Sequence, residues 1–328
     1  MDLGALHRLA FLTLPNYSMI ACANGIEVLR MANRLSGQTA YAWEVVTPDG
    51  VPAPASNGLS LHPTNSLSRM ARPDLLFACG GVDVREAVDT HVTAALRRLA
   101  REGVALGSLC TGAFALAEAG LLRGRRCAIH WENLPPIEEE FREVEFVGDL
   151  YAVDRDRVTC TGGVAPLSLM LAMVEARLGP ALSAAVAAQF LVDRVRAGSE
   201  RQRDPVGPAA PGKLGDALRI MESTIEAPMH AAAVARSAGL SPRQLERLFR
   251  QHLGQTPAAY AAGLRLERAR ILLRETAMPV TAVGAACGYA TPSRFSAAFR
   301  GRFGRPPNQE RRQRAAAGAH DARQPPAH

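Results

Sequence analysis

The chain has 328 residues, of which 48% are apolar and 21% charged, and its formal net charge is +7. This composition is typical of a globular protein, and the length predicts two domains, because domains usually span about 100–200 residues. It argues against a membrane protein, since the longest apolar run, at 167–174, is far short of the roughly 20 residues that a span needs. The six cysteines lack C-x-x-C spacing, so no disulfide, zinc site or other cofactor is predicted, and we expect a reduced, cytoplasmic protein.

Strand-like and helical segments alternate over residues 1–198. The predicted strands are 8–14, 42–48, 73–81, 104–110 and 126–130, with a hairpin at 151–163, and the predicted helices are 25–35, 84–102, 168–179 and 181–196. This alternation is typical of an α/β sandwich with a mainly parallel sheet. Ligands of such sheets bind beyond the carboxyl ends of the strands. We therefore expect four strand ends to meet at one edge, namely Gly80-Gly81, Cys110, His130 and Gly162-Gly163.

The stretch GSLCTGAFALAEAG, residues 107–120, places Cys110 at a turn from strand to helix. Several hydrolases carry a nucleophile at such a turn, and His130 offers a base. The following helix N-terminus would lower the pKa of the thiol. However, NYSMIACANG, residues 16–25, contains no acid, Glu27 is expected to face solvent, and no third group is evident to orient His130. Three roles for Cys110 stay open: a nucleophile, the lining of a ligand pocket, or a small buried residue.

The segment SERQRDPVGPAAPGK begins at residue 199 and is rich in proline and polar residues, which predicts a linker over 199–212. Charge changes across it. Residues 213–328 contain 18 Lys and Arg and 8 Asp and Glu, whereas residues 1–212 contain 20 and 23. A basic module beside a near-neutral one predicts binding of a polyanion. We expect this module at 213–312, with a disordered tail at 313–328.

Residues 238–257, AGLSPRQLERLFRQHLGQTP, and 287–307, CGYATPSRFSAAFRGRFGRPP, repeat one pattern. Each copy has a glycine turn, an N-cap (Ser241 or Thr291), a proline at the first helical position, and apolar residues at helical spacing. Short helices are predicted at 230–238 and 280–286, and a long helix at 260–275 joins the copies. The pattern predicts two helix-turn-helix units. A helical bundle with solvated arginines is the alternative.

The polar face of each predicted second helix carries the candidate DNA-binding residues. Arginine and glutamine can pair with base edges, whereas later arginines are placed to meet phosphates. The candidates are Ser241, Arg243, Gln244, Arg247, Arg250, Thr291, Ser293, Arg294, Arg300 and Arg302. We expect the first copy to carry more specificity, because Ala297 stands where the first copy has Arg247.

The stretches GLSPRQLERLFRQHLGQTPAAY, LRLERARILLRET and CGYATPSRFSAAFRGRFGRPP resemble the AraC-type DNA-binding domain over residues 215–312. Two positions depart from that pattern. Gly284 stands where alanine is common, which predicts a helix weakened by up to about 1 kcal/mol. Glu310 stands where an aromatic often follows the closing proline. We expect both to affect packing more than DNA recognition.

The stretch GSLCTGAFALAEAGLLRGRRCAIHW is similar to the PfpI-like, class I glutamine amidotransferase-like domain. With LPNYSMIACANGIEVLRMANRLSG and ASNGLSL, the chain from 8 to 312 resembles the GlxA family of AraC-type regulators. The resemblance implies that Cys110 and His130 hold the positions of an active-site cysteine and its partner. The missing early acid predicts that this site is not catalytic.

The resemblance implies a transcription regulator, expected to be an activator, that binds promoter DNA and a small nitrogen-containing effector such as an amino acid or a quaternary amine. The expected effector site comprises Gly80, Gly81, Cys110, Thr111, Gly112, His130, Trp131, Thr161 and Gly162. A homodimer and a contact with RNA polymerase are also expected. Two alternatives stay open: a cysteine-dependent hydrolase or lyase fused to a DNA-binding module, and a first domain that only dimerises.

Overall fold

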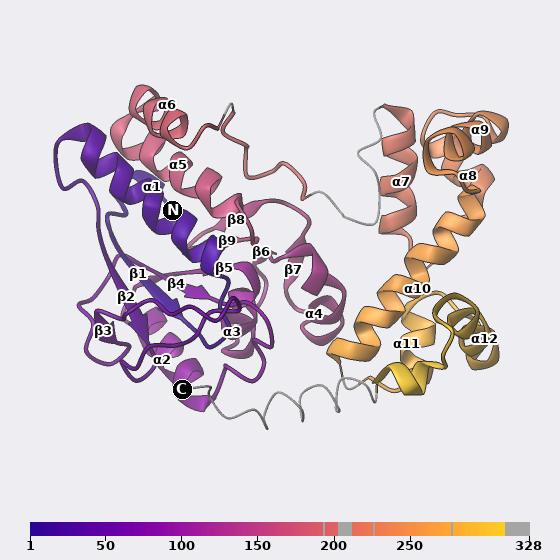
Figure 1. The fold of residues 1–328 in the computed structure, drawn as a ribbon, viewed down its shortest axis with the longest axis horizontal. Helices are drawn as coiled ribbons and strands as arrows, with labels where there is room; N and C mark the ends of the chain where they lie inside the picture. The colour runs from indigo at the N-terminus through magenta and orange to yellow at the C-terminus, as the bar shows by residue number, and fades with distance from the viewer. Residues whose placement is uncertain (193, 203–211, 226, 277, 312–328) are drawn as a thin grey trace. The chain divides into compact units, whose positions relative to one another are not determined.

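The computed structural model describes residues 1–192, 194–202, 212–225, 227–276 and 278–311 (Figure 1). The chain divides into two compact units, Met1–Gln202 and Arg203–His328. The predicted tail at 313–328 and most of the predicted linker lie outside the described residues. No helix in the described part of the chain is long and apolar enough to cross a membrane.

The first unit is built on a seven-stranded sheet with the order β3-β2-β1-β4-β5-β9-β8. All neighbouring strands are parallel except the β8–β9 hairpin. The strands are β1 (Arg8–Thr13), β2 (Ala42–Thr47), β3 (Asn65–Ser66), β4 (Leu75–Cys79), β5 (Ala105–Leu109), β8 (Tyr151–Asp154) and β9 (Arg157–Cys160). The predicted α/β class is therefore confirmed.

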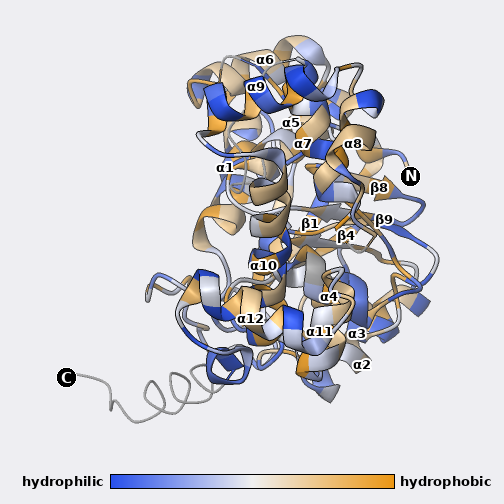
Figure 2. Ribbon diagram, turned by 90° about the vertical axis from the view of Figure 1, so that its right-hand side faces the viewer, coloured by the Kyte–Doolittle hydropathy of each residue, from blue (hydrophilic) through white to orange (hydrophobic). Residues whose placement is uncertain are grey.

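Helices cover both faces of this sheet because its central strands are buried on both sides. Alternate residues of β1 show this: Phe11 packs with α1 (Met19–Ser36), α5 (Ala165–Leu178) and α6 (Pro180–Gln189), whereas Leu12 packs with α2 (Thr90–Arg101) and α3 (Ala113–Glu118). Figure 2 shows apolar residues along β1 and β4, as expected for strands buried between two layers of helices.

Several predicted segments differ from the structure, and the helix predicted at 25–35 begins six residues earlier, at Met19. The helix predicted at 84–102 begins only at Thr90, where the Asp89 carboxylate accepts a hydrogen bond from the backbone N–H of Val92. The helix predicted at 181–196 ends at Gln189. The strand predicted at 126–130 is the short β6 (Arg126–Ala128), which pairs with β7 (Glu145–Val147) outside the main sheet; α4 (Leu134–Glu140) lies between them in the chain.

The end of the first unit extends past the predicted domain boundary at residue 198. The N–H of Leu150 is shared between the carbonyls of Gly198 and Glu200, and the N–H of Gln202 donates to the carbonyl of Gly148 at 2.9 Å. Residues 199–202, which the sequence predicts as linker, therefore pack on the first unit.

The second unit is all helical. Its helices are α7 (Lys213–Ser223), α8 (Ala231–Ser237), α9 (Pro242–Leu253), α10 (Pro257–Glu275), α11 (Val280–Ala286) and α12 (Pro292–Phe303). Two cores divide it. The first joins α7, α8, α9 and the start of α10, and the second joins the rest of α10 with α11 and α12. α10 thus belongs to both predicted helix-turn-helix units.

The two copies of the repeat have the same pattern of burial. Exposed and buried residues follow the same order in 241–250 and in 291–300. Ser241 and Thr291 cap α9 and α12 through hydrogen bonds from the third helical N–H, as predicted. Each helix ends at a glycine in the left-handed region, Gly254 with φ 65° and Gly304 with φ 70°, where a side chain would be strained.

Gly284 affects packing, as predicted, in addition to weakening α11. A Cβ at this position would lie 3.0 Å from the ring of Phe295, closer than side chains normally pack. The glycine lets the buried Phe295 ring of α12 approach the backbone of α11. The glycine lowers the helix propensity of α11 but allows close contact between α11 and α12.

Candidate functional sites

The turn at Cys110 is a strained strand-to-helix elbow. Cys110 has φ 59°, a conformation that costs a non-glycine residue about 1–2 kcal/mol. The elbow rests on the end of β4, because a Cβ on Gly112 would lie 1.9 Å from the carbonyl oxygen of Ala78, and Thr111 Oγ1 donates to the carbonyl of Gly81 at 2.7 Å. A Cβ on Gly80 would likewise lie 2.4 Å from the N atom of Gly112. These predicted site residues hold the elbow in place through backbone contact.

Cys110 and His130 meet over Gly162. A Cβ on Gly162 would lie 2.9 Å from Cys110 Sγ and 2.8 Å from His130 Cδ2. The predicted convergence at one edge is thus observed, although β6 delivers His130 from outside the main sheet. Thr161 is also at this edge and is buried. Cys110 is 9% exposed, so its thiol lies at the base of the site.

Both reactive groups are uncharged near neutral pH. Burial raises the pKa of Cys110 to about 11, although a backbone hydrogen bond from Thr111 acts in the opposite direction and Glu132 adds to the rise. Burial also lowers the pKa of His130, against the attraction of Glu132. A thiol with a pKa this high is a poor nucleophile, because the thiolate is the reactive form.

The carboxylate nearest to His130 among its described contacts is Glu132, which sequence reasoning missed. Its Oε2 lies 4.0 Å from His130 Nδ1, beyond hydrogen-bond distance, and its side chain is 64% exposed. The signal was available, since Glu132 follows His130 by two residues. Glu27 pairs with Arg30 at 2.7 Å on the surface of α1, as its predicted exposure implies. The geometry of an oriented triad is not present in these contacts.

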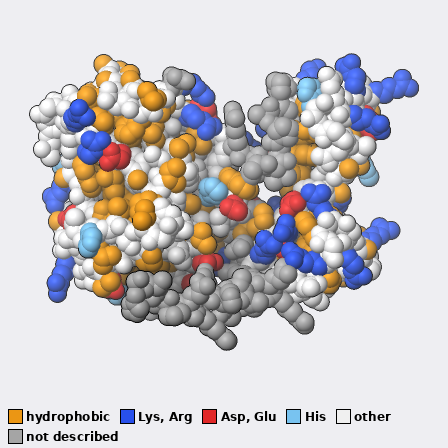
Figure 3. Space-filling model, in the orientation of Figure 1, with side chains coloured by type: hydrophobic (Ala, Val, Ile, Leu, Met, Phe, Trp, Pro, Cys, Tyr) orange, Lys and Arg blue, Asp and Glu red, His pale blue; other side chains and the backbone are white. Residues whose placement is uncertain are grey.

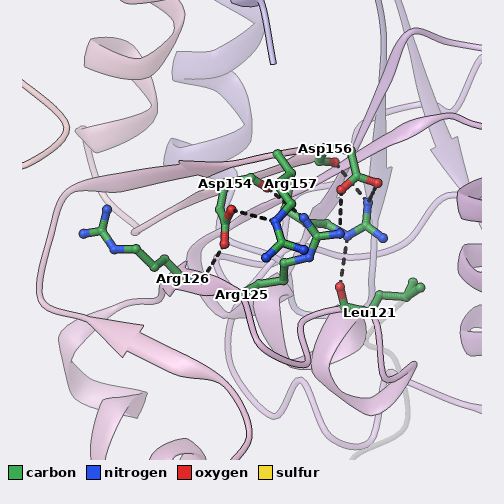
Figure 4. A network of polar contacts seen from close by, with 7 residues as sticks. Leu121, Arg125, Arg126, Asp154, Asp156 and Arg157 are labelled. Carbon is green, nitrogen blue, oxygen red and sulfur yellow. Dashed lines mark hydrogen bonds and ion pairs between the residues drawn. The ribbon is translucent and has the colours of Figure 1, made fainter.

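Side chains from elsewhere in the first unit hold the segment that carries His130. Thr159 Oγ1 accepts from the N–H of Ala128 at 2.8 Å, and Asp154 Oδ2 accepts from the N–H of Arg126 at 2.9 Å. Figure 4 shows the surrounding ion pairs, in which Arg125 and the buried Arg157 share Asp156. This network fastens β6 to the β8–β9 hairpin and so fixes the approach to His130.

Trp131 lies beside His130, with ring centroids 5.4 Å apart. Its backbone N–H donates to Gln202 Oε1 at 2.9 Å. Two surface hollows of about 350 and 510 Å³ lie elsewhere on the first unit, the former beside α2 and the latter beside the end of α5. Polar side chains line both hollows, but neither lining includes Cys110 or His130, so we retain the Cys110 edge as the candidate site.

In the second unit, α9 presents Arg243, Arg247 and Arg250 as exposed side chains. Gln244 is also exposed, and its Oε1 accepts a hydrogen bond from the backbone N–H of Ser241 at 2.8 Å; its contact with DNA stays a prediction. The two residues form a capping box. On the face seen in Figure 3, Lys and Arg side chains gather on this unit.

In the second copy, α12 presents Ser293, Arg294 and Arg300 to solvent. Arg302 instead pairs with Glu267 of α10 at 3.1 Å. This ion pair links α12 to α10 at the surface, and the predicted phosphate contact of Arg302 stays a prediction. Ser293 Oγ lies 3.3 Å from the Thr291 hydroxyl, beside the cap.

Known protein families match both units of the chain. The DJ-1/PfpI family matches residues 19–176, and a helix-turn-helix domain family matches residues 234–313. The HTH-type transcriptional regulator GbdR of Pseudomonas aeruginosa is 39% identical over 92% of this chain and 83% of its own length. GlxA of Rhizobium meliloti, also named an HTH-type transcriptional regulator, is 36% identical over 95% and 97%.

A crystal structure of an AraC family transcriptional regulator from Pseudomonas putida is similar over 56% of this chain and 99% of that one, with 28% identity and a TM-score of 0.50. The full-length relatives are named as regulators, so the hydrolase alternative is not retained. This chain belongs to the GlxA-like HTH-type transcriptional regulators, in which a DJ-1/PfpI domain precedes an AraC-type DNA-binding domain.

Proposed function

We propose that this DNA-binding regulator is an activator whose first unit binds a small nitrogen-containing metabolite at the Cys110 edge. The observation that carries the proposal is the convergence of Cys110 Sγ and His130 over Gly162, with both side chains uncharged. Such a site suits binding without covalent chemistry. The remaining predicted residues frame it: Gly80, Gly81, Thr111, Gly112 and Thr161 build the edge, and Trp131 adds an aromatic ring.

The charge at the rim favours a cationic nitrogen. The Glu132 carboxylate is exposed beside His130, and the indole of Trp131 is adjacent. An ammonium group is attracted to both a carboxylate and an aromatic face. An amino acid or a quaternary amine presents such a group.

A thermal-shift screen followed by titration calorimetry tests this function. Choline, trimethylglycine and L-arginine serve as probes that carry a cationic nitrogen, and succinate serves as an anionic probe without one. We expect a probe with a cationic nitrogen to raise the melting temperature, and Glu132→Gln to weaken its binding by up to about fivefold. Glu27→Gln, a surface carboxylate on α1, is the matched control. If succinate stabilises the protein as well as any probe with a cationic nitrogen, or Glu132→Gln binds like the control, the site is not a nitrogen sensor.

For the DNA-binding unit we propose that Arg243, Arg247 and Arg294 contact bases, that Arg250 and Arg300 contact phosphates, and that Ser241, Thr291 and Ser293 place the helix N-termini. Gln244 binds the N–H of Ser241 and Arg302 pairs with Glu267, and we propose that these contacts stabilise α9 and α12. Arg300→Ala should weaken binding to every DNA sequence and reduce the slope of log affinity against log salt by about 0.9. Arg302→Ala serves as the comparison and should leave that slope unchanged. Equal slopes for both variants would remove Arg300 from the phosphate contacts.

A homodimer and a contact with RNA polymerase belong to the same proposal, because an activator must present its DNA-binding units to a promoter in a ligand-dependent way. Ligand binding can shift that presentation only if the ligand prefers one arrangement. Sedimentation with and without the bound probe tests the dimer. A monomer under both conditions contradicts it.

A further inference from the structure

Gln202 is the last residue of the first unit, and its side chain binds the backbone on both sides of His130. Its Nε2 donates to the carbonyl of Ile129 at 2.8 Å, and its Oε1 accepts from the N–H of Trp131 at 2.9 Å. One amide thus satisfies the acceptor before His130 and the donor after it, as a paired strand would. The position of His130 and the end of the unit are joined by these two bonds.

The chain before Gln202 is anchored independently of the site. Glu200 forms ion pairs with Arg194 at 2.6 Å and Arg196 at 3.2 Å, and the N–H of Leu150 reaches the carbonyls of Gly198 and Glu200. These contacts fix where residues 198–200 lie without touching His130. Gln202 also binds the chain at Gly148 and Asp149, through its N–H and its Nε2, and its two bonds at Ile129 and Trp131 link the segment to the backbone beside His130.

The site has little room for a ligand without such movement. Cys110 is 9% exposed, and even a methyl group on Gly162 would overlap both Cys110 Sγ and His130 Cδ2. Asp154 and Thr159 hold the preceding strand as far as Ala128. A molecule that reaches the thiol must displace His130 and Trp131 and so strain the bonds to Gln202.

We propose that Gln202 is a positioning residue that couples occupancy of the Cys110 edge to the start of the interdomain linker. When His130 moves, the amide loses its bonds to Ile129 and Trp131 and keeps only the weaker Nε2 bond to the carbonyl of Asp149 at 3.3 Å. Residues 201–202 are then held mainly by the backbone bond from Gln202 to Gly148 and exchange faster. This inference rests on the proposed function, but it concerns the coupling and not the identity of the ligand.

Hydrogen exchange on the full-length chain tests the coupling without any effector. Gly162→Ala places a methyl group between Cys110 and His130 and acts as an internal wedge. We expect it to raise amide exchange in residues 198–202 by about fivefold or more, the factor expected for one lost hydrogen bond. In a Gln202→Ala background the wedge should add nothing there. Gln202→Ala alone should raise exchange of the Trp131 amide.

Two controls keep the result interpretable. Arg201→Ala alters a neighbouring exposed side chain and should preserve the response to the wedge. If Gly162→Ala does not fold, Cys110→Met provides a second wedge, because its longer side chain occupies the same space. Cys110→Ser, which adds no bulk, is its control.

The proposal is overturned if the wedge raises exchange at 127–132 and leaves 198–202 unchanged. It is also overturned if Trp131 stays protected in Gln202→Ala. Failure to find a metabolite in the thermal-shift screen would count against the effector class alone, since these measurements use no metabolite.

Discussion

The two helix-turn-helix units share one burial pattern but close it with different chemistry. In the first helix-turn-helix unit, Tyr260 lies in α10 after the end of α9, where it is buried and packs edge-on against Phe249 with ring centroids 5.5 Å apart. At the corresponding position of the second unit, Glu310 is fully buried. Its carboxylate binds Arg270 at 3.0 Å and also pairs with Arg274 and Arg305. The same backbone arrangement therefore accommodates an aromatic contact in one unit and a cluster of ion pairs in the other.

The difference lies in what each solution depends on. An aromatic contact is insensitive to pH and salt. The ion pairs of a buried carboxylate stabilise the fold only while the carboxylate is charged and its arginine partners are in place. Arg270 and Arg274 come from α10 and Arg305 follows α12, so Glu310 joins the two elements that position the second unit's exposed arginines. The stability of the second helix-turn-helix unit should accordingly depend more on pH and salt than that of the first.

The largest expected effect comes from removing the carboxylate. Glu310→Ala removes the shared partner of three partly exposed arginines and should destabilise the second helix-turn-helix unit by about 1.5–3 kcal/mol. Hydrogen exchange of α12 amides in the full chain measures this. Glu246→Ala is the matched control, because its pairing with Arg250 is long and exposed, and it should change stability by less than about 0.5 kcal/mol. Similar exchange of α12 in both variants would rule out stabilisation by these ion pairs.

Acid should destabilise the second helix-turn-helix unit before the first. Burial by itself raises the pKa of Glu310, but hydrogen bonds from Arg270, Arg305 and Arg274 outweigh it and hold the pKa below its ordinary value of 4.5. A carboxylate with a lowered pKa stabilises the fold fully above that ordinary value and loses this contribution as pH falls through the folded pKa. The protection of α12, corrected for intrinsic exchange, should thus fall below pH 4.5 before that of α9. Glu310→Gln, already destabilised, should lack this additional loss.

DNA recognition should also be unequal. We expect Arg243→Ala in the first unit to cost about 1–3 kcal/mol of discrimination against a mismatched base. Arg294→Ala in the second unit should cost less, because Ala297 stands in place of Arg247 nearby. Competition binding on a randomised DNA library measures both. Loss of discrimination in Arg294→Ala alone would reverse the ranking.

The smallest effect concerns two glycines of the second unit. Nothing lies within 4 Å of a Cβ built on Gly301, so Gly301→Ala should stabilise α12 by up to about 1 kcal/mol through helix propensity. Gly284→Ala should lose that gain, because its methyl group would press on Phe295. Thermal unfolding of the two variants gives the comparison. An equal gain at both positions would mean that the Phe295 ring yields freely.

Much of this architecture follows from local pattern. Alternating strands and helices predicted the sheet, and the repeat predicted both helix pairs and their caps at Ser241 and Thr291. Even the role of Gln244 was within reach, since a glutamine three residues after a serine cap is a capping-box signal. These features depend on residues close in sequence.

The remaining features depend on contacts between distant residues. Strand propensity could not show that β6 leaves the main sheet, since that is decided by pairing with β7 and by Thr159. The amide of Gln202 lies 73 residues from Ile129, and Glu310 lies 40 residues from Arg270. Polar side chains of this kind look like solvent-exposed residues until the fold brings their partners together.

The shared helix α10 also sets the spacing of the two helix-turn-helix units. Its 19 residues extend about 28 Å, comparable to the roughly 34 Å of one turn of the double helix. One residue inserted at its centre would rotate α12 by about 100° relative to α9. We expect such an insertion to turn one set of exposed arginines away from the DNA face that the other set contacts.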